Sequence, residues 1–405
     1  MTVCVLGAGL LGTLSALELA ERGRDVVLID AGDQPVTGTS LHNEGKIHLG
    51  YVYARDRTQA TARLMARGAT RFSALLDRWW PAAEIMQSAS SPFDYLVMAD
   101  SLEHPDRLER VYAEIDDTIG QHLSAATNSY LGRPDLPPVQ RLTKPELEET
   151  YDPQYVVAAF RTPERAIDLS RMAHALRTAI RGAGHVTGLW STRVQAVRTR
   201  SDGRFDILTG DGGLEGPFTE VVNALWHDRL RVDATLGIEV TRPFLFRQKV
   251  AHRMQVPGGQ THGASATMVL GPYGDFVTLP SGSCYLSWYP TSCIRRTDRI
   301  RPPDDWNDTP DSFLVGTFDS AVEELARRVP GIARLAAQST ERSSVPGVIF
   351  CWGQTDVDDP QSELHARHDV GLSTLGPPGY HTVDTGKLTL APLFAEEIAD
   401  RIAPR

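Results

Sequence analysis

The protein has 405 residues, of which 41% are hydrophobic and 23% charged, enough for two globular domains. Its formal net charge of −10 argues against a nucleic-acid partner, and its four cysteines lack the CxxC spacing of a metal site or a redox pair. A basic leader and an apolar run of about twenty residues are both missing, which predicts a cytoplasmic protein with no membrane partner.

The first thirty residues predict a strand, a glycine turn, a helix and a second strand. A short apolar run leads into Gly7, Gly9 and Gly12, and a helical pattern follows. In this motif Gly7 permits a tight turn, Gly9 lets backbone N–H groups approach a diphosphate, and Gly12 lets helix and strand pack closely. The second apolar run ends at Asp30, the position of a carboxylate that accepts a ribose hydroxyl. The stretch therefore predicts a site for an ADP-containing dinucleotide.

A loop rich in small and polar residues follows, as far as about residue 51. Polar residues crowd between glycines, while Ile47, Leu49, Tyr51 and Tyr53 have the spacing of half-buried positions. We therefore expect the loop to lie against a ligand and not in solvent. Its candidate cofactor-binding residues are Ser40, His42, Asn43 and Gly45.

The rest of the chain alternates between helical and strand patterns. Helices are predicted over residues 58–80, 107–119, 168–181, 312–329 and 393–402. Strands are predicted over residues 92–98, 156–160, 194–198, 204–208, 220–226, 244–250, 276–279, 283–289 and 347–352. In the strand over 283–289, Tyr285, Ser287 and Tyr289 are predicted to share one face.

This order predicts a fold of the class α/β plus α+β, in which a Rossmann-like domain is interleaved with an antiparallel-sheet domain. The cofactor domain is predicted to be discontinuous, over residues 1–85, 161–240 and 344–405. The substrate domain is predicted over residues 86–160 and 241–343.

The sequence resembles the D-amino-acid-oxidase-like superfamily of FAD oxidoreductases, whose relatives include glycine and sarcosine oxidases and L-2-hydroxyglutarate dehydrogenases. Besides the dinucleotide motif, residues 43–50 are similar to the N-S-G-x-I-H-x-G loop of the hydroxyglutarate enzymes. Residues 386–392 are similar to the closing G-x-x-x-A-P turn of the family. Residues 221–224 are similar to its V-V-N-A-A-G strand, except that Leu225-Trp226-His227 replaces the expected Ala-Gly.

The resemblance implies FAD as the cofactor and an oxidase or dehydrogenase as the activity. A small amine, amino acid or hydroxy acid would lose a hydride from its CH–N or CH–O carbon to flavin N5. The electron acceptor is left open between O2 and an electron carrier. Outside the motifs above, the cofactor-binding residues are expected to be Val194, Gly386, Lys387, Leu388 and Thr389.

Four residues are candidates for the chemistry itself. His48 matches the histidine of the hydroxyglutarate pattern, and Lys387 precedes the last helix, where a cation would face the negative charge that a reduced flavin carries near N1. The alternative for Lys387 is a solvated first-turn lysine. Arg247 is a candidate for gripping a substrate carboxylate, and Tyr285 for lining the same pocket.

Some members of the family tether the flavin through a histidine three residues before the loop glycine, where His42 stands relative to Gly45. The alternative is a hydrogen-bonded loop histidine. Burial and Lys46 would keep this imidazole neutral, and Glu44 would oppose them. We predict a non-covalent flavin, with His42 as the tether if that prediction fails.

Two rival functions stay open at this stage. A flavin-dependent monooxygenase would share the scaffold, although the Gly-Asp motif that such enzymes carry before the last helix is missing around Asp384. The other rival is a flavin-bound subunit without turnover of its own.

Overall fold

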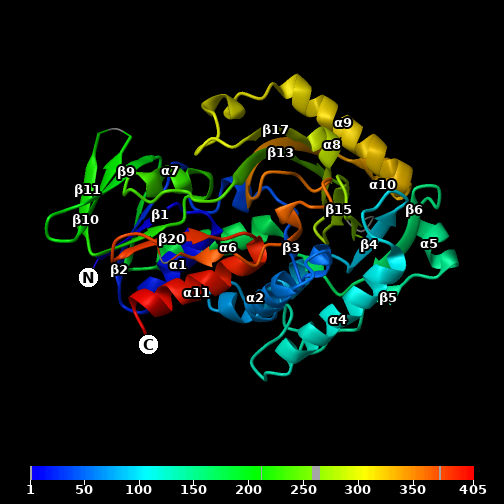
Figure 1. Ribbon diagram of the computed structural model, residues 1–405, viewed down its shortest axis with the longest axis horizontal. Helices are drawn as coiled ribbons and strands as arrows, with labels where there is room; N and C mark the ends of the chain where they lie inside the picture. The colour runs from blue at the N-terminus through cyan, green and yellow to red at the C-terminus, as the bar shows by residue number, and fades with distance from the viewer. Residues whose placement is uncertain (1, 211, 258–264, 374) are drawn as a thin grey trace.

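The computed structural model describes residues 2–210, 212–257, 265–373 and 375–405. Its described strands form a mostly parallel sheet, a large mixed sheet and two small sheets (Figure 1). Within these described ranges, no helix is both long enough and apolar enough to cross a membrane.

The mostly parallel sheet places the ends of four strands at one edge. Its order is β19–β20–β12–β1–β2–β8, and only the pair β19–β20 is antiparallel. The strands are β1 (Thr2–Leu6), β2 (Asp25–Ile29), β8 (Val186–Leu189), β12 (Glu220–Asn223), β19 (Gly371–Leu372) and β20 (Tyr380–Asp384). Since β1, β2, β12 and β20 run in the same direction, Gly7, Asp30, Ala224 and Gly386 follow their carboxyl ends along one edge. Ligands bind at that edge in open α/β sheets.

Both faces of this sheet are covered, which agrees with the apolar composition of its strands. Helix α1 (Leu10–Glu21) packs between α6 (Leu169–Gly182) and α11 (Ala391–Ile402) in one apolar core. On the other face, Cys4, Leu6 and Ile29 pack against a small antiparallel sheet. That sheet contains β9 (Val194–Thr199), β10 (Phe205–Thr209) and β11 (Leu214–Phe218), beside helix α7 (Arg229–Ala234).

The large sheet has the order β17–β13–β16–β15–β14–β4–β6–β5, with β18 pairing along β13. Its strands come from two separate parts of the chain. The first part contributes β4 (Phe93–Met98), β5 (Gln140–Arg141) and β6 (Val156–Arg161). The second contributes β13 (Phe244–Gln255), β14 (Ser265–Val269), β15 (Gly274–Thr278), β16 (Ser283–Trp288), β17 (Cys293–Thr297) and β18 (Glu341–Trp352).

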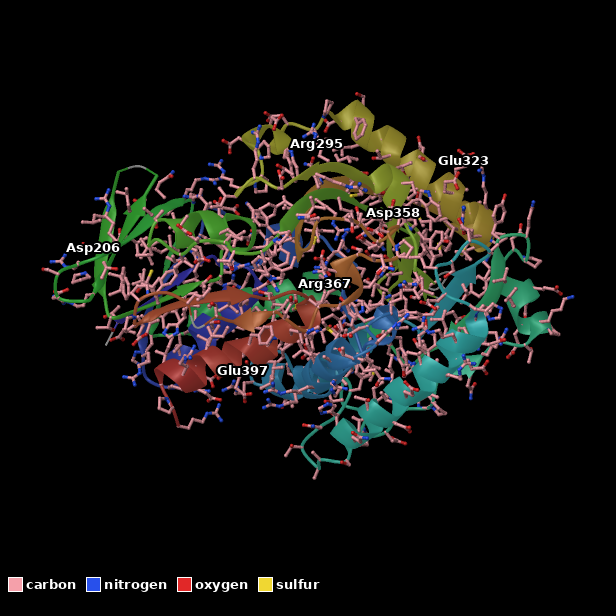
Figure 2. The ribbon with its side chains drawn as sticks, viewed as in Figure 1. Asp206, Arg295, Glu323, Asp358, Arg367 and Glu397 are labelled. Carbon is pink, nitrogen blue, oxygen red and sulfur yellow. The ribbon has the colours of Figure 1, made fainter. Side chains whose placement is uncertain are left out.

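Helices cover the large sheet and fill the space beside the parallel one (Figure 2). Along the top of Figure 1, α8 (Tyr289–Ser292), α9 (Asp311–Arg328) and α10 (Gly331–Gln338) lie over the large sheet. Helices α2 (Ala60–Leu76) and α4 (Pro105–Leu123) pack on each other at the bottom of the view, and α2 also contacts α11. The shorter helices are α3 (Ala82–Ser88) and α5 (Lys144–Thr150).

Several sequence predictions need correction. The predicted strand over 283–289 ends at Trp288, and Tyr289 begins helix α8, so Tyr289 does not extend the face of Tyr285 and Ser287. The strand predicted to begin the third cofactor-domain segment belongs to β18, which pairs with β13 from Phe244↔Trp352 to Gln255↔Glu341 in the large sheet. The helix predicted over 58–80 ends at Leu76. Strands β8, β14 and β17 and helix α10 were not predicted.

Candidate functional site

The glycine turn after β1 is too crowded for any side chain at two of its three glycines. Gly7 has a φ of +91°, and a Cβ there would lie 2.8 Å from the Ala224 carbonyl oxygen. A Cβ on Gly12 would lie 1.8 Å from the Gly7 carbonyl oxygen. Gly9 caps α1, and the Ser40 hydroxyl accepts a hydrogen bond of 2.9 Å from the Leu10 N–H. The glycines thus keep side chains out of the turn before α1, as the close approach of a diphosphate requires.

Asp30 lies beside this turn and is hydrogen-bonded to it. Its Oδ2 accepts a hydrogen bond from the Ala8 N–H at 2.6 Å, and its Oδ1 accepts one from the Gly32 N–H at 2.6 Å. A carboxylate has about four acceptor positions, so two bonds leave room for ribose hydroxyls. Asp30 is half-buried, with its carboxylate fixed by the backbone that surrounds the turn.

The loop after β2 is held by its own backbone and by the large sheet. Asn43 accepts a hydrogen bond of 2.8 Å from the Gly45 N–H and donates one of 2.8 Å to the Thr39 carbonyl. From β13, the Arg253 guanidinium donates to the carbonyls of Leu41 and Asn43, at 2.9 and 3.2 Å. These hydrogen bonds hold the loop in place where the parallel sheet meets the large sheet.

The loop over residues 43–50 and the closing turn over residues 386–392, which were both predicted to bind the flavin, contact each other. Strand β3 (Lys46–Ile47), which pairs with β7 (Arg165–Ala166), leads to His48. The His48 N–H donates a hydrogen bond of 2.8 Å to the hydroxyl of Thr389, which is fully buried. Gly386 has a φ of +63°, and the turn through η6 (Leu388–Leu390) leads straight into α11.

His48 is buried between two carboxylates. Its Nε2 lies 3.5 Å from Glu44, and its Nδ1 lies 3.9 Å from Glu164. Neither ring nitrogen has a hydrogen-bond partner among the described residues. Burial and the nearby Lys387 lower the pKa of His48, and the two carboxylates oppose them. The neutral ring, which can accept a proton, is thereby favoured at neutral pH.

Charges of both signs gather beside His48. Although burial opposes it, His48, Lys387 and Lys249 hold the pKa of Glu44 well below its usual range. The Lys249 ammonium lies 4.4 Å from the ring centre of Tyr289 and 6.0 Å from that of Tyr285. Among the residues that the structure describes, no carboxylate lies within ion-pair distance of Lys249 or Lys387. Two ammonium groups beside an ionised Glu44 are therefore available to a ligand.

Arg247 is deeply buried and already has an anionic partner. Its Nη1 donates to Asp356 at 2.5 Å, and the same carboxylate pairs with Arg296 at 2.8 Å. This pairing favours a structural role for Arg247 over the predicted grip on a substrate carboxylate, because the charge is compensated inside the protein.

Val194, a predicted cofactor-binding residue, begins β9, and Trp226 follows the carboxyl end of β12. Val194 is buried against the parallel sheet, and its carbonyl accepts a hydrogen bond of 2.7 Å from Arg231. Trp226 has a φ of +54° at the position of the expected family glycine, and its indole N–H donates to the Val348 carbonyl at 2.7 Å. A bulky residue in this backbone conformation is strained.

Comparison with known proteins identifies the architecture. The chain matches the profile of the family described as FAD dependent oxidoreductase, DAO, over residues 2–401. The chain belongs to the DAO family of FAD-dependent oxidoreductases. It is therefore an FAD-dependent oxidoreductase, with FAD as its cofactor.

Solved structures agree with this fold. Glycine oxidase from Geobacillus kaustophilus is 18% identical, with a TM-score of 0.69 over 98% of this chain and 93% of that chain. L-proline dehydrogenase from P. horikoshii is 16% identical, with a TM-score of 0.68 over 99% and 92%. L-α-glycerophosphate oxidase from Mycoplasma pneumoniae, solved with FAD bound, is 16% identical, with a TM-score of 0.68 over 99% and 94%.

A closer but much shorter match links the chain to a curated relative. D-amino acid dehydrogenase from Rhizobium johnstonii is 45% identical over 51 residues, which are 13% of this chain and 12% of that protein. The match therefore spans only a small part of the relative's length and carries no information about its substrate domain.

The residues present fit FAD. The glycine turn at the N-terminus of α1 and the free acceptor positions of Asp30 suit its ADP half. The unpartnered ring of His48 and the ammonium of Lys387, where the loop and the closing turn meet, suit its flavin half. The assignment of each of these residues to one half of FAD stays a prediction.

Sequence reasoning missed three charged residues of this DAO-family site, Glu44, Lys249 and Glu164. Glu44 lies inside the motif of residues 43–50 but was considered only as a neighbour of His42. Lys249 lies two residues after Arg247 on the same strand, so the alternation rule places both on one face and could have indicated it. Glu164 follows the end of β6, and no local pattern connects it with His48.

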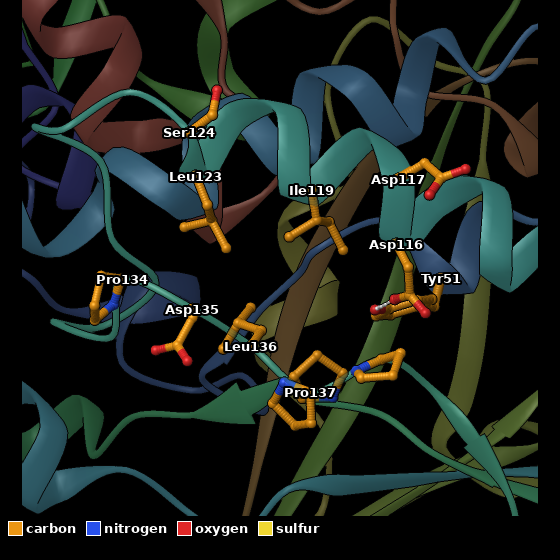
Figure 3. A pocket seen from close by; sticks show the side chains of 13 residues that line it. Tyr51, Asp116, Asp117, Ile119, Leu123, Ser124, Pro134, Asp135, Leu136 and Pro137 are labelled. Atoms are coloured by element: carbon orange, nitrogen blue, oxygen red, sulfur yellow. Dashed lines mark hydrogen bonds between the residues drawn. The ribbon is translucent and has the colours of Figure 1, made fainter.

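A hollow in the surface lies apart from these charged groups. Its volume is about 410 Å³, and it is bounded by the C-terminal half of α4 and by residues 134–138 (Figure 3). On its wall the Tyr51 hydroxyl donates to Asp116 at 2.5 Å. It shares no lining residue with the charged groups beside His48, so we do not assign substrate to it.

We expect the flavin of this DAO-family enzyme to be released by acid, as predicted from the sequence. His42 is half-buried, and burial together with Arg253, not Lys46, lowers its pKa. A neutral ring is needed for a covalent bond to the flavin but does not by itself form one, so His42 stays the candidate tether if the prediction fails. The ammonium of Lys46 instead contacts Thr267 and lies 4.0 Å from the Phe93 ring centre. Acid precipitation should leave a colourless pellet under a yellow supernatant. A yellow pellet that turns white in the His42→Ala variant would contradict the prediction and identify the tether.

Proposed function

We propose that this protein is an FAD-dependent oxidase or dehydrogenase that takes a hydride from the CH–N carbon of a small amino acid or amine. The observation that carries the proposal is the gathering of charges beside His48: Glu44 lies 3.5 Å from its ring, and Lys249 and Lys387, which lower the pKa of Glu44, have no carboxylate within ion-pair distance among the described residues. A zwitterion presents both charges that such a site attracts. An α-hydroxy acid, the alternative substrate, has no ammonium for Glu44.

The names of similar proteins support this substrate class. The structural neighbours include a glycine oxidase and an L-proline dehydrogenase, and the short match is to a D-amino acid dehydrogenase. We propose a cytoplasmic location, with oxygen or an electron carrier as the acceptor. Following flavin reoxidation with air and with a dye acceptor would separate an oxidase from a dehydrogenase.

Each residue has a distinct part in the proposal. Lys249 attracts the substrate carboxylate, and Glu44 attracts the ammonium. The neutral His48 ring accepts a proton from the ammonium, so that the nitrogen lone pair is free when the C–H bond breaks. Tyr285 forms the wall beside Lys249; burial raises the pKa of its phenol to about 12, which keeps it protonated. Bound FAD supplies the hydride acceptor, and the protein supplies orientation and charge.

An anaerobic screen tests the proposal. Amino acids, N-methyl amino acids and hydroxy acids are added separately to the FAD-bound protein, and flavin absorbance is followed. Bleaching by amino acids or amines alone supports the proposal, and bleaching by hydroxy acids alone contradicts the substrate class. Absence of bleaching by every compound would favour a subunit without turnover, and rapid oxidation of NADH or NADPH would favour a monooxygenase.

A Lys387→Met variant should have a lower flavin reduction potential. The lysine precedes η6 and α11, and its ammonium would stabilise the negative charge of the reduced flavin. A charged hydrogen bond contributes about 1.5–3 kcal/mol, which corresponds to a fall of about 30–60 mV for a two-electron couple. Reduction by substrate should slow in parallel.

The matched control for this variant is Lys144→Met. Lys144 is exposed on α5, in a part of the large-sheet domain remote from the closing turn, so its loss should leave the potential unchanged. Equal potentials for Lys387→Met and the parent protein would return Lys387 to its alternative as a solvated lysine.

A further inference from the structure

Glu164 is a buried carboxylate that holds the backbone next to His48. It lies between β6 and β7, and its side chain is fully shielded from solvent. Its Oε1 accepts hydrogen bonds from the N–H groups of Leu49 and Gly50, at 2.6 and 3.2 Å. Its Oε2 accepts one of 2.5 Å from the Tyr95 hydroxyl. Three hydrogen bonds, at least one on each oxygen, thus fix the orientation of this carboxylate.

The surroundings of Glu164 are aromatic and do not compensate its charge. The rings of Tyr51, Tyr95 and Tyr112 meet edge to face, with centroids 5.4 to 6.1 Å apart. Among the described residues, only His48 lies within ion-pair distance of this carboxylate. A buried acid without a lysine or arginine is costly to stability, so a structural role alone accounts poorly for it.

We infer that Glu164 is a positioning residue: it fixes the Leu49–Gly50 backbone, and its charge, 3.9 Å from Nδ1, makes His48 a better proton acceptor. The inference rests on the proposed function, in which His48 accepts the proton of the substrate ammonium. It assigns to Glu164 the role of a second carboxylate, on the side of the ring opposite Glu44.

The other groups around His48 set the sign of the expected effect. Glu44 faces Nε2 at 3.5 Å, and Tyr53 lies beside the ring with centroids 6.3 Å apart. Burial, Lys387 and Lys46 lower the pKa of His48, whereas Glu44 and Glu164 raise it. Removal of the Glu164 charge leaves the lowering influences less opposed. The pKa of His48 should therefore fall further in a Glu164→Gln variant.

The test follows the His48 ring directly, without substrate. FAD-bound protein carrying 13C-labelled histidine is titrated by NMR, and the His48→Asn variant identifies the signal. An opposite charge at this distance changes a pKa by about one pH unit or more, so Glu164→Gln should lower the His48 midpoint by about one. Glutamine keeps an acceptor for the Leu49 and Gly50 N–H groups, so bound FAD should be retained.

The matched control is Asp94→Asn. Asp94 is also a buried carboxylate of the large sheet that accepts a tyrosine hydroxyl, from Tyr151 at 2.8 Å, but its cation partner is Arg161. Its loss should leave His48 unchanged. An unchanged midpoint in Glu164→Gln, or an equal fall in Asp94→Asn, would overturn the inference.

Two further measurements keep the inference testable: one applies if the glutamine variant does not fold, and the other applies once a substrate is known. If the glutamine variant does not fold, Glu164→Asp keeps the charge but withdraws it by one methylene, and a smaller fall of the same midpoint is expected; no fall contradicts the inference. With a substrate in hand, the acid limb of the kcat/KM profile should move to lower pH in Glu164→Gln. A failed substrate screen would leave the NMR result valid, so the two proposals can fail separately.

Discussion

A Gly12→Ala variant is expected to lose most of its bound FAD and to unfold at a lower temperature than the parent protein. The added methyl carbon would lie 1.8 Å from the Gly7 carbonyl oxygen. Gly7 has little room to move away, because a Cβ built on it would already lie 2.8 Å from the Ala224 carbonyl oxygen, and its φ is +91°. The clash should therefore distort the glycine turn, which is predicted to face the diphosphate of FAD. Overpacking of this kind costs about 1–3 kcal/mol, which corresponds to about a 5- to 150-fold loss of FAD affinity if the whole cost falls on FAD binding.

A Gly120→Ala variant is the matched control for this effect. Gly120 also lies in a helix, α4, but a Cβ there would meet no other atom within 4 Å. Both substitutions gain about 1 kcal/mol of helix propensity, so only the clash distinguishes them. Thermal unfolding and the flavin-to-protein absorbance ratio measure the two effects. A Gly12→Ala protein that is as yellow and as stable as Gly120→Ala would show that the turn can relax.

An Asp30→Ala variant should bind FAD at least tenfold more weakly. The substitution removes the acceptor for the ribose and leaves the N–H groups of Ala8 and Gly32 without their carboxylate partner. A charged hydrogen bond contributes about 1.5–3 kcal/mol, and one such bond to the ribose already accounts for tenfold. The loosened turn should add to this loss, because Ala8 belongs to the glycine motif itself.

Two other variants separate the contributions to this loss. Asp33→Ala removes an exposed acid three residues further along the same loop, and its FAD affinity should equal that of the parent protein. Asp30→Asn keeps one side-chain oxygen as an acceptor but loses the charge, so its affinity should lie between the two. Titration of the apoprotein with FAD, followed by flavin fluorescence, gives the three affinities. An unchanged affinity in Asp30→Ala would refute the role of Asp30.

The sequence by itself determined the dinucleotide unit and the family. The spacing of Gly7, Gly9 and Gly12 predicted a turn whose crowding the structure confirms, because a strand, a tight turn and a helix are encoded by residues close in the chain. The parallel order of β1, β2 and β12 then followed, and it brings the predicted cofactor positions to one edge.

Only the tertiary structure decided how the charged side chains pair. Glu164 and His48 are 116 residues apart, and Arg247 and Asp356 are 109 apart, so no local periodicity relates them. Arg247 has the sequence context of a substrate-binding arginine, yet Asp356 neutralises it, whereas Lys249 is left free for a ligand. The sequence also did not show that Tyr289 begins α8 or that β18 belongs to the large sheet. The reason is physical: alternation fixes the face on which a side chain lies, but its partner depends on which distant segment the fold packs against that face.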